Sequence, residues 1–234
     1  MTAPCGYRRA AAGVHPSNRY SPYASTAKRA PAYAPVAVEQ TLSEITGPRP
    51  GAESIRPGDE DMTRFDGGIA IGERIVVTGR VLDEDGRAIP HTLIEIWQAN
   101  AAGRYAHPND SHDAPLDPHF AGIGRVLTDS AGTYRFVTVK PGAYPWRNHP
   151  NAWRPQHIHF SLFGPGFATR LITQMYFPGD PLLAFDPVFN SVADADARAR
   201  LIAAFELEAT VPEHALGYRF DLVLRGRDAT PIGL

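Results

Sequence analysis

The sequence predicts a mainly β protein: an antiparallel or mixed β-sandwich with an extended N-terminal arm and one helix near the C-terminus. Three observations support this fold class. The first 70 residues are rich in proline and tyrosine. From residue 73 onward, short runs of β-branched and aromatic residues alternate with glycine and proline turns. A single segment repeats its apolar residues at helical spacing. Many short strands joined by turns are typical of sandwiches and barrels.

Residues 1–70 form the predicted arm. Eight prolines in this segment interrupt every candidate periodic run, and each of them removes a backbone hydrogen-bond donor. Four tyrosines make the segment more aromatic than disordered chains usually are. We therefore expect an extended arm that lies on a partner chain or on the body of the protein, which residues 71–234 form.

The predicted strands follow in order along the body. Residues 74–82 and 92–97 are rich in β-branched residues, and the turn at 83–86 between them predicts a hairpin. Further strands are predicted at residues 124–128, 134–139, 157–163, 172–176 and 218–224, and a turn at 129–132 joins the first two of these. The predicted helix covers residues 194–207, where alanine, isoleucine and leucine fall near helical spacing.

Composition and charge exclude several classes of partner. The chain has 23 Lys+Arg against 25 Asp+Glu, and without a long basic block it is not expected to bind nucleic acid or a membrane surface. No run approaches the roughly 18 apolar residues of a spanning helix, and no apolar signal segment is visible. The single cysteine, Cys5, can form neither an intrachain disulfide nor a thiolate metal cage. These features suit a reducing cytoplasm.

The most informative residues are His157 and His159, two positions apart in a predicted strand. Side chains at i and i+2 of a strand point to the same face, with Cα atoms about 6.7 Å apart. Both imidazoles can therefore reach one metal ion while Ile158 turns into the opposite layer. Two histidines that bind no metal fit the same pattern, so both interpretations stay open at this point.

Additional ligands would decide the chemistry of such a pair. Zinc hydrolases add a third histidine or a carboxylate, and ferrous oxygenases add a carboxylate. Here two upstream loops carry tyrosines instead, Tyr105 and Tyr144. Ionising a phenol at pH 7 costs about 4 kcal/mol, so a tyrosine ligand requires a strongly charged cation. A set of two tyrosines and two histidines therefore predicts Fe(III), whereas a packed ring with a solvated hydroxyl is the ordinary alternative for each tyrosine.

Four strings of the sequence together resemble the intradiol ring-cleaving dioxygenases. They are residues 72–105, 141–148, 153–165 and 171–181, and the likeness extends from about residue 14 to residue 226. The resemblance implies a mixed β-sandwich with one non-haem Fe(III) per chain. The implied reaction is cleavage of protocatechuate (3,4-dihydroxybenzoate) by O₂ to 3-carboxy-cis,cis-muconate. It also implies a hetero-oligomer with an α chain of similar fold, in which residues 1–70 contact the partner and residues 71–234 form the catalytic domain.

The resemblance also assigns the iron ligands. By motif match, the four protein ligands are Tyr105, Tyr144, His157 and His159. In this family the tyrosine at the place of Tyr144 is displaced by the catechol, so Tyr144 is also expected to act in catalysis as a proton acceptor.

Further residues are expected around the substrate. Arg154 is expected to bind the substrate and to stabilise the electron-rich ring carbon that meets O₂. Gln174 is expected to hydrogen-bond the substrate or a reacting oxygen. Trp146 is expected to form a wall of the pocket, and Tyr23 matches a substrate-contacting tyrosine of the family, with Tyr20 three residues away as the alternative.

Three alternatives remain. An intradiol dioxygenase for hydroxyquinol or catechol generally carries a helical N-terminal dimerisation region, whereas proline interrupts residues 1–70. A zinc hydrolase or cupin-like enzyme would use His157 and His159 with a carboxylate, and it would be colourless, whereas phenolate bound to Fe(III) absorbs visible light. A non-catalytic β-sandwich binding module would hold no iron tightly.

Overall fold

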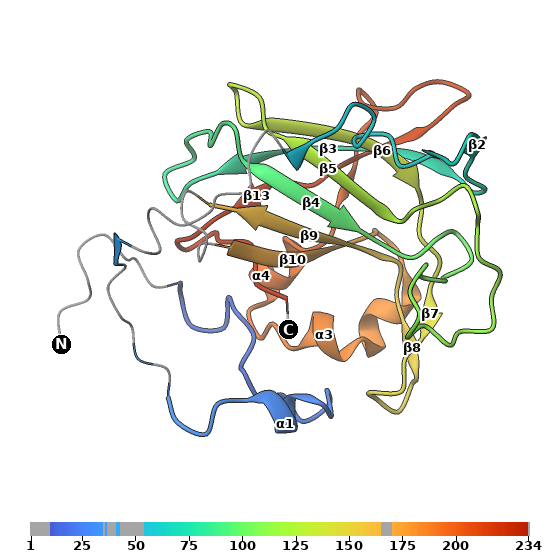
Figure 1. Cartoon of the computed structure of the whole chain (residues 1–234). Coiled ribbons are helices and arrows are strands. Elements are labelled where there is room, and N and C mark those ends of the chain that lie inside the picture. Colours follow the sequence, from blue (N-terminus) through green and yellow to red (C-terminus); the bar gives the residue numbers. More distant parts are fainter. Residues whose placement is uncertain (1–9, 35, 37–40, 43–53, 165–169, 234) are drawn as a thin grey trace.

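The computed structural model describes residues 10–34, 36, 41–42, 54–164 and 170–233. Two β-sheets pack face to face, with the helices α3 and α4 beside one of them and the N-terminal segment beyond these helices (Figure 1). The predicted mixed β-sandwich is confirmed. Within the described ranges, no helix has both the length and the apolar character needed to cross a membrane.

The first sheet has four antiparallel strands in the order β10–β9–β4–β5. These strands are β4 (Leu93–Trp97), β5 (Ile123–Leu127), β9 (His157–Phe163) and β10 (Arg170–Tyr176). The register places His159 opposite Trp97 on one side and Gln174 on the other, and Tyr176 opposite His157. The side chains that the sequence singles out therefore meet at one end of this sheet.

The second sheet is mixed and is built around β3 (Arg74–Leu82). The strand β6 (Thr133–Val139) pairs with β3 antiparallel. On the other side of β3, β12 (Leu216–Arg219) and β13 (Leu222–Val223) pair with it in parallel, and β11 (Ala204–Phe205) pairs antiparallel with β12.

Short elements surround the two sheets. The strands β1 (Arg64–Phe65) and β2 (Gly68–Ile69) form a hairpin, and β7 (Tyr144–Pro145) pairs with β8 (Trp153–Arg154) at the end of the sandwich where β9 begins (Figure 1). The helical segments are α1 (Thr26–Arg29), η2 (Pro181–Phe185), α3 (Pro187–Asn190) and α4 (Ala195–Ala199).

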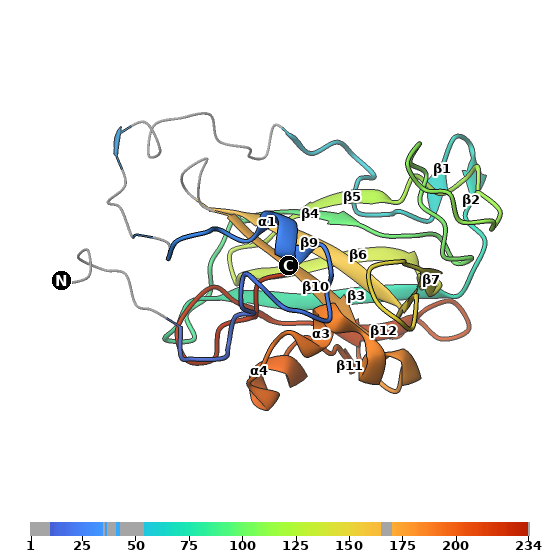
Figure 2. The same cartoon turned by 90° about the horizontal axis from the view of Figure 1, so that it is seen from below.

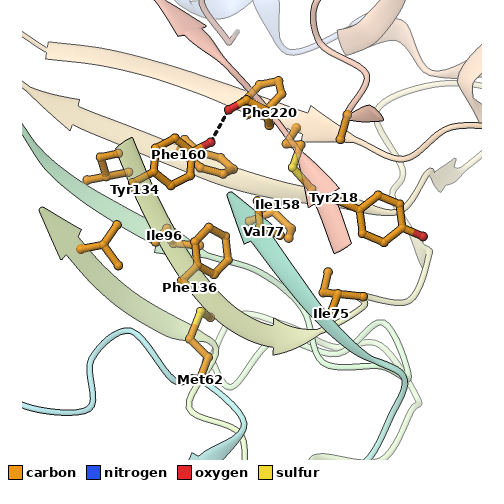
Figure 3. Packing of buried hydrophobic residues seen from close by; sticks show 14 of the residues in the cluster. Met62, Ile75, Val77, Ile96, Tyr134, Phe136, Ile158, Phe160, Tyr218 and Phe220 are labelled. Atoms are coloured by element: carbon orange, nitrogen blue, oxygen red, sulfur yellow. Dashed lines mark hydrogen bonds between the residues drawn. The ribbon is translucent and has the colours of Figure 1, made fainter. Parts of the chain in front are cut away.

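The apolar core fills the space between the two sheets. Phe136 on β6 packs against Phe160 on β9, with ring centroids 5.9 Å apart, and Ile158 is fully buried in the same cluster (Figure 3). The hydroxyl of Tyr134 donates a hydrogen bond to the carbonyl of Phe220 across this core. Because strand side chains alternate between faces, burial of the residues at 158 and 160 turns the two histidines of β9 to the outer face.

The predicted hairpin of residues 74–82 with 92–97 is wrong, because β3 and β4 lie in different sheets. The chain does reverse at 83–86, where Gly86 has φ +78° and the Asp83 N–H donates to the Arg87 carbonyl at 2.9 Å. His91 then takes φ +54° and the chain passes to the opposite sheet. The turn at 129–132 likewise connects β5 to β6 across the two sheets.

The predicted helix at 194–207 is also too long. It begins as expected, since the Asp194 carboxylate caps α4 by accepting the Ala197 N–H at 2.8 Å, but α4 ends at Ala199. The Tyr176 N–H donates to the Leu201 carbonyl at 2.8 Å, which draws the chain out of the helix and alongside β10. Of the short helical segments, only α4 lies within the predicted range; η2 and α3 precede it, and the strand β11 occupies residues near its end.

Part of the N-terminal segment packs on the chain's own body (Figure 2). Val14 is buried in an apolar cluster with Val192 and Leu201, and the Asp194 N–H donates to the Gly13 carbonyl at 3.1 Å. Farther along, the Ala24 N–H donates to the Asn148 carbonyl at 3.2 Å. This segment therefore runs from α4 to the loop after β7. That the arm also contacts a partner chain stays a prediction.

Candidate metal centre

The two histidines of β9 lie side by side on the outer face of the four-stranded sheet. Their ring centroids are 4.9 Å apart. The indole of Trp97, on the neighbouring strand β4, stacks on the His159 ring at 4.7 Å and 5°. The same-face geometry predicted from the His-x-His spacing is thus present, with Ile158 pointing into the core as expected.

The segment before β9 determines which ring nitrogen of His157 carries the proton. Its Nδ1 lies 2.7 Å from the Pro155 carbonyl oxygen. A carbonyl only accepts hydrogen bonds, so Nδ1 carries the proton and the lone pair is on Nε2. This lone pair meets the Tyr144 hydroxyl at 3.2 Å. His157 is therefore oriented by its backbone partner in the way that metal-binding histidines usually are.

Two glycines bring the tyrosine-bearing loops together. Gly103 has φ +78°, and a β-carbon there would overlap the Ala143 carbonyl oxygen. A β-carbon on Gly142 would overlap the backbone of residues 101–103, and its N–H donates to the Asn100 carbonyl at 2.9 Å. Only residues without a side chain allow this backbone contact. As a result the rings of the two tyrosines, Tyr105 and Tyr144, lie edge to face at 5.4 Å.

Two polar residues that the sequence analysis did not single out hold the loop of Tyr105. The buried Asn100 accepts the N–H groups of Ala102 and Arg104 on Oδ1, at 3.0 and 2.9 Å. Asp110 accepts the Tyr105 N–H at 2.7 Å. Asn and Asp side chains often hydrogen-bond nearby backbone N–H groups in turns. This residue type, in the loop on either side of Tyr105, was the sequence signal that could have identified both residues.

The four predicted ligands converge at this end of the sheet. The Tyr105 ring lies 6.5 Å from that of His159, and the Tyr144 hydroxyl contacts His157. The Tyr105 hydroxyl is buried without a hydrogen-bond partner among the described residues. Leaving a buried hydroxyl unpaired costs about 1–3 kcal/mol, so this oxygen is suited to a ligand that occupies the centre. Two phenol oxygens and two imidazole nitrogens fit Fe(III).

The described part of the chain contains no group of three or more His, Cys, Asp or Glu side chains that could hold a metal ion. The histidine pair therefore has no carboxylate and no third imidazole as a fellow ligand there. A zinc hydrolase or cupin-like site would need one of these. Among the described residues, the oxygens that lie beside the histidine pair are those of Tyr105 and Tyr144.

Burial sets the protonation of the four groups in the metal-free protein. It raises the pKa of Tyr105 well above the usual value, and it raises the pKa of Tyr144 against the opposing positive charge of Arg154. Burial and the same positive charge lower the pKa of His159 to about 3 and that of His157 well below its usual value. Without a cation the centre thus holds two phenols and two neutral imidazoles.

Arg154 lies beside the centre and is only 4% exposed. Its Nε donates to the Asp186 carboxylate at 2.8 Å, and its Nη2 donates to Gln174 Oε1 at 2.6 Å. The Tyr176 hydroxyl joins the same network: its single proton is shared between Gln174 Oε1 at 2.9 Å and the Asp186 carboxylate at 3.0 Å. The structure therefore brings the predicted Arg154 and Gln174 together. Asp186 and Tyr176 were missed by the sequence analysis.

The remaining predicted residues extend from Arg154 toward the arm. The guanidinium of Arg154 lies over the Trp146 ring at 5.1 Å, and the Tyr23 ring meets Trp146 edge-on at 4.7 Å. The guanidinium of Arg29, in α1, also lies over the Tyr23 ring, 4.7 Å from its centroid. Tyr23 thus reaches the surroundings of the centre although it lies more than 80 residues before the first tyrosine ligand candidate.

Comparisons with known proteins agree with this geometry. A sequence model of a family described as dioxygenase matches residues 45–226, and a model described as the N-terminal part of the protocatechuate 3,4-dioxygenase beta subunit matches residues 7–41. The chain is 59% identical over 220 residues to the protocatechuate 3,4-dioxygenase beta chain of Burkholderia cepacia, covering 93% of each.

More distant relatives share the same body. The chain is 34% identical over 164 residues to the protocatechuate 3,4-dioxygenase alpha chain of Burkholderia cepacia, covering 69% of this chain and 77% of that one. The solved dioxygenase domain of a dioxygenase–carbohydrate-binding fusion protein from Streptomyces sp. SirexAA-E matches with a TM-score of 0.51 and 25% identity, covering 76% of this chain and 97% of that one. The family match, the high identity and the shared sandwich lead to one conclusion: the chain belongs to the intradiol ring-cleaving dioxygenases.

Proposed function

We propose that this chain is the β chain of a protocatechuate 3,4-dioxygenase. It acts with an α chain of similar fold and cleaves 3,4-dihydroxybenzoate between its two hydroxylated carbons. Both atoms of O₂ enter the product, 3-carboxy-cis,cis-muconate. The observation that carries this proposal is the convergence of the half-buried Tyr105, Tyr144 and His159 with the buried His157. The hydroxyl oxygen of Tyr105 is itself buried and has no hydrogen-bond partner among the described residues.

The family uses non-haem iron, and in our proposal this chain holds one Fe(III). Its ligands are the hydroxyl oxygens of Tyr105 and Tyr144 and the ring nitrogens of His157 and His159. Two phenolates and a hydroxide cancel the three positive charges of the ion, so the buried centre carries no net charge. When bound, ferric iron supplies the Lewis acidity that withdraws electron density from the catechol.

The protein's own groups bind the substrate and move its protons. The Tyr144 oxygen accepts a proton from a catechol hydroxyl. Arg154 stabilises negative charge that develops on the ring, because a buried fixed cation interacts strongly with such charge. Trp146 and Tyr23 form the apolar wall against which the aromatic ring packs. Gln174 orients Arg154 through its carbonyl oxygen, and its amide nitrogen is available to the substrate.

The choice of protocatechuate over other catechols depends on the arm. The match of residues 7–41 to an N-terminal region of β subunits supports the protocatechuate type over enzymes for hydroxyquinol or catechol. In this proposal residues 71–234 form the catalytic domain. Residues 1–70 bring Tyr23 to the pocket and contact the α chain, while Met62 and Ala70 at the end of this segment pack in the core of the sandwich.

The proposal is tested on protein co-expressed with an α chain. We expect one iron per β chain, a broad visible absorption from tyrosinate bound to Fe(III), and a change in that spectrum when protocatechuate is added without O₂. Admission of O₂ should yield carboxymuconate, with hydroxyquinol and catechol turned over more slowly. A colourless protein at full metal content, or equal turnover of the three catechols, would contradict the proposal. Full activity of the β chain alone would refute the need for α.

A further inference from the structure

Two Asp-Pro pairs each begin a short helical segment beside the centre. Asp180 precedes Pro181 at the start of η2, and its Oδ1 accepts the Leu182 N–H at 2.9 Å. Asp186 precedes Pro187 at the start of α3, and its Oδ2 accepts the Phe189 N–H at 3.1 Å. Both aspartates therefore cap a helical segment in the ordinary way.

Each of these carboxylates also reaches the segment that leads into β9. The other oxygen of Asp180 accepts the Gln156 N–H at 2.8 Å. The other oxygen of Asp186 accepts Arg154 Nε–H at 2.8 Å. The two caps thus fasten residues 154–156, which carry Arg154 and the carbonyl that orients His157.

The Asp186 carboxylate accepts more hydrogen bonds than that of Asp180 and is more deeply buried. Its side chain is fully buried, and it accepts hydrogen bonds from the Tyr176 hydroxyl at 3.0 Å and from Arg154 Nη2 at 3.2 Å in addition to those above. Its own backbone carbonyl accepts a hydrogen bond from the Asn190 side chain at 2.9 Å. The carboxylate is therefore fixed by groups on β10 and α3 and cannot turn independently of them.

The hydrogen bonds of Arg154 fix the direction of its guanidinium. Nε is bound by Asp186, and Nη2 is shared among Gln174, Tyr176 and Asp186. The positive charge of Arg154 also acts on Tyr144, where it opposes the rise in pKa that burial causes. An arginine held at two of its nitrogens presents the third in a defined direction, because the guanidinium is planar and rigid.

We propose that Asp186 is a positioning residue for the reaction: it holds the guanidinium of Arg154 in place beside the reacting ring. This inference rests on the proposed function. Asp186 touches neither substrate nor metal in this scheme and acts only through Arg154. Because small displacements of a catalytic group cause large losses of rate, the effect of Asp186 is expected in kcat more than in KM.

Asp194 supplies a matched control. It also caps a short helix, accepting the Ala197 N–H of α4 at 2.8 Å. Among the described residues, no hydrogen bond or ion pair joins its side chain to Arg154 or to the four candidate ligands. Asp194→Asn and Asp186→Asn therefore make the same chemical change at a helix cap, and they differ in the contact with Arg154.

The main experiment is a double-mutant cycle on the αβ enzyme with Asp186→Asn, Arg154→Lys and both changes together. For Asp186→Asn we expect kcat per bound iron to fall about 10- to 100-fold, with KM within about threefold of wild type and an unchanged visible spectrum. In the Arg154→Lys background, adding Asp186→Asn should lower kcat per bound iron by a further factor of less than about three. If the loss of kcat in the double mutant equals the product of the two single losses, the two residues act independently and the proposal is overturned. An unchanged kcat per iron in Asp186→Asn would overturn it as well.

A second readout does not depend on turnover. Arg154 is to be labelled with an arginine-specific glyoxal in the αβ enzyme and followed by peptide mass spectrometry. Labelling should be slow in wild type and in Asp194→Asn and about tenfold faster in Asp186→Asn, because loss of the ion pair frees the guanidinium. Equal labelling in Asp186→Asn and Asp194→Asn would refute the inference.

Should Asp186→Asn fail to fold, Tyr176→Phe replaces it, since this change removes one donor from the same carboxylate. We expect it to increase labelling of Arg154 and to lower kcat per iron by a smaller factor, and no change in either would overturn the inference. Failure of the proposed function itself would be distinct, because wild-type enzyme would then lack colour or turnover.

Discussion

The hydroxyl of Tyr144 lies 3.2 Å from Nε2 of His157. With Nδ1 of the imidazole donating to the Pro155 carbonyl, the phenol is the donor in this contact. The metal-free centre is therefore closed by a neutral hydrogen bond between two proposed ligands. Tyr105, the other phenol, has no such partner among the described residues. The two tyrosines thus differ in their energetic role before any metal binds.

This difference predicts opposite effects of removing the two hydroxyls. In the metal-free chain, Tyr105→Phe removes an unsatisfied buried group and should raise the free energy of unfolding by about 1 kcal/mol, whereas Tyr144→Phe removes a hydrogen bond and should lower it by about 1 kcal/mol. Denaturant unfolding after chelation measures both values. Each variant should also lose visible absorption on iron loading. Equal shifts of stability in the two variants would contradict this assignment.

The contact between the two loops predicts that Gly103→Ala abolishes the centre. An alanine there would be strained at φ +78° and would overlap the Ala143 carbonyl oxygen. We expect a loss of at least about 2 kcal/mol of stability and of most bound iron. Gly86→Ala is the control, since Gly86 has the same φ but nothing within 4 Å of a β-carbon. It should cost about 1 kcal/mol and retain the iron, and loss of iron there too would remove the special role of Gly103.

Arg154→Lys should retain iron and lose about 100-fold or more in kcat. A lysine cannot reproduce the simultaneous hydrogen bonds to Asp186 and Gln174, because its ammonium is a single point charge. Steady-state kinetics with iron quantified in the same sample measures this effect. An unchanged kcat would remove the role proposed for Arg154.

We expect the packing of the N-terminal segment to depend on pH through His15. Its Nδ1 accepts the Ile232 N–H at 3.3 Å, and burial lowers the pKa of this histidine below its usual value. The folded state thus favours the neutral imidazole. Its contribution to stability is fully present above the unfolded pKa of about 6.5 and is lost as pH falls through the lower folded pKa.

We therefore expect the arm to loosen from the C-terminal segment in acid. Hydrogen exchange of the Ile232 amide, corrected for the intrinsic rate, should show less protection at pH 5 than at pH 7. His15→Gln keeps an acceptor without a titrating ring, so its protection should not depend on pH. A wild-type protection that is constant between these two pH values would rule out this role of His15.

The sequence allowed the strands and the histidine pair to be predicted, because both depend on local alternation. Residues 157–163 alternate so regularly that the face of His157 and His159 followed from the spacing alone. The nearness of Tyr105 and Tyr144 to these histidines did not follow from spacing. It was implied by the family resemblance, because loop residues far apart in sequence carry no periodic signal of their meeting.

The errors and omissions have related causes. The hairpin of β3 and β4 was predicted wrongly because a local turn does not indicate in which sheet the next strand will pair. The helix after Asp194 was predicted too long because pairing with Tyr176 overrides helical spacing. Asp186 was missed because its Asp-Pro pair is typical of any helix start, and its partner Arg154 lies 32 residues earlier.

The backbone contact at Gly103 and Gly142 joins the two tyrosine loops into one rigid unit, whereas Tyr23 comes from a separate segment near the N-terminus. In the proposed function, metal retention and choice of substrate therefore depend on different segments of the chain. Exchange of the N-terminal segment between relatives is therefore a way to change the substrate without changing the residues proposed to bind the metal ion.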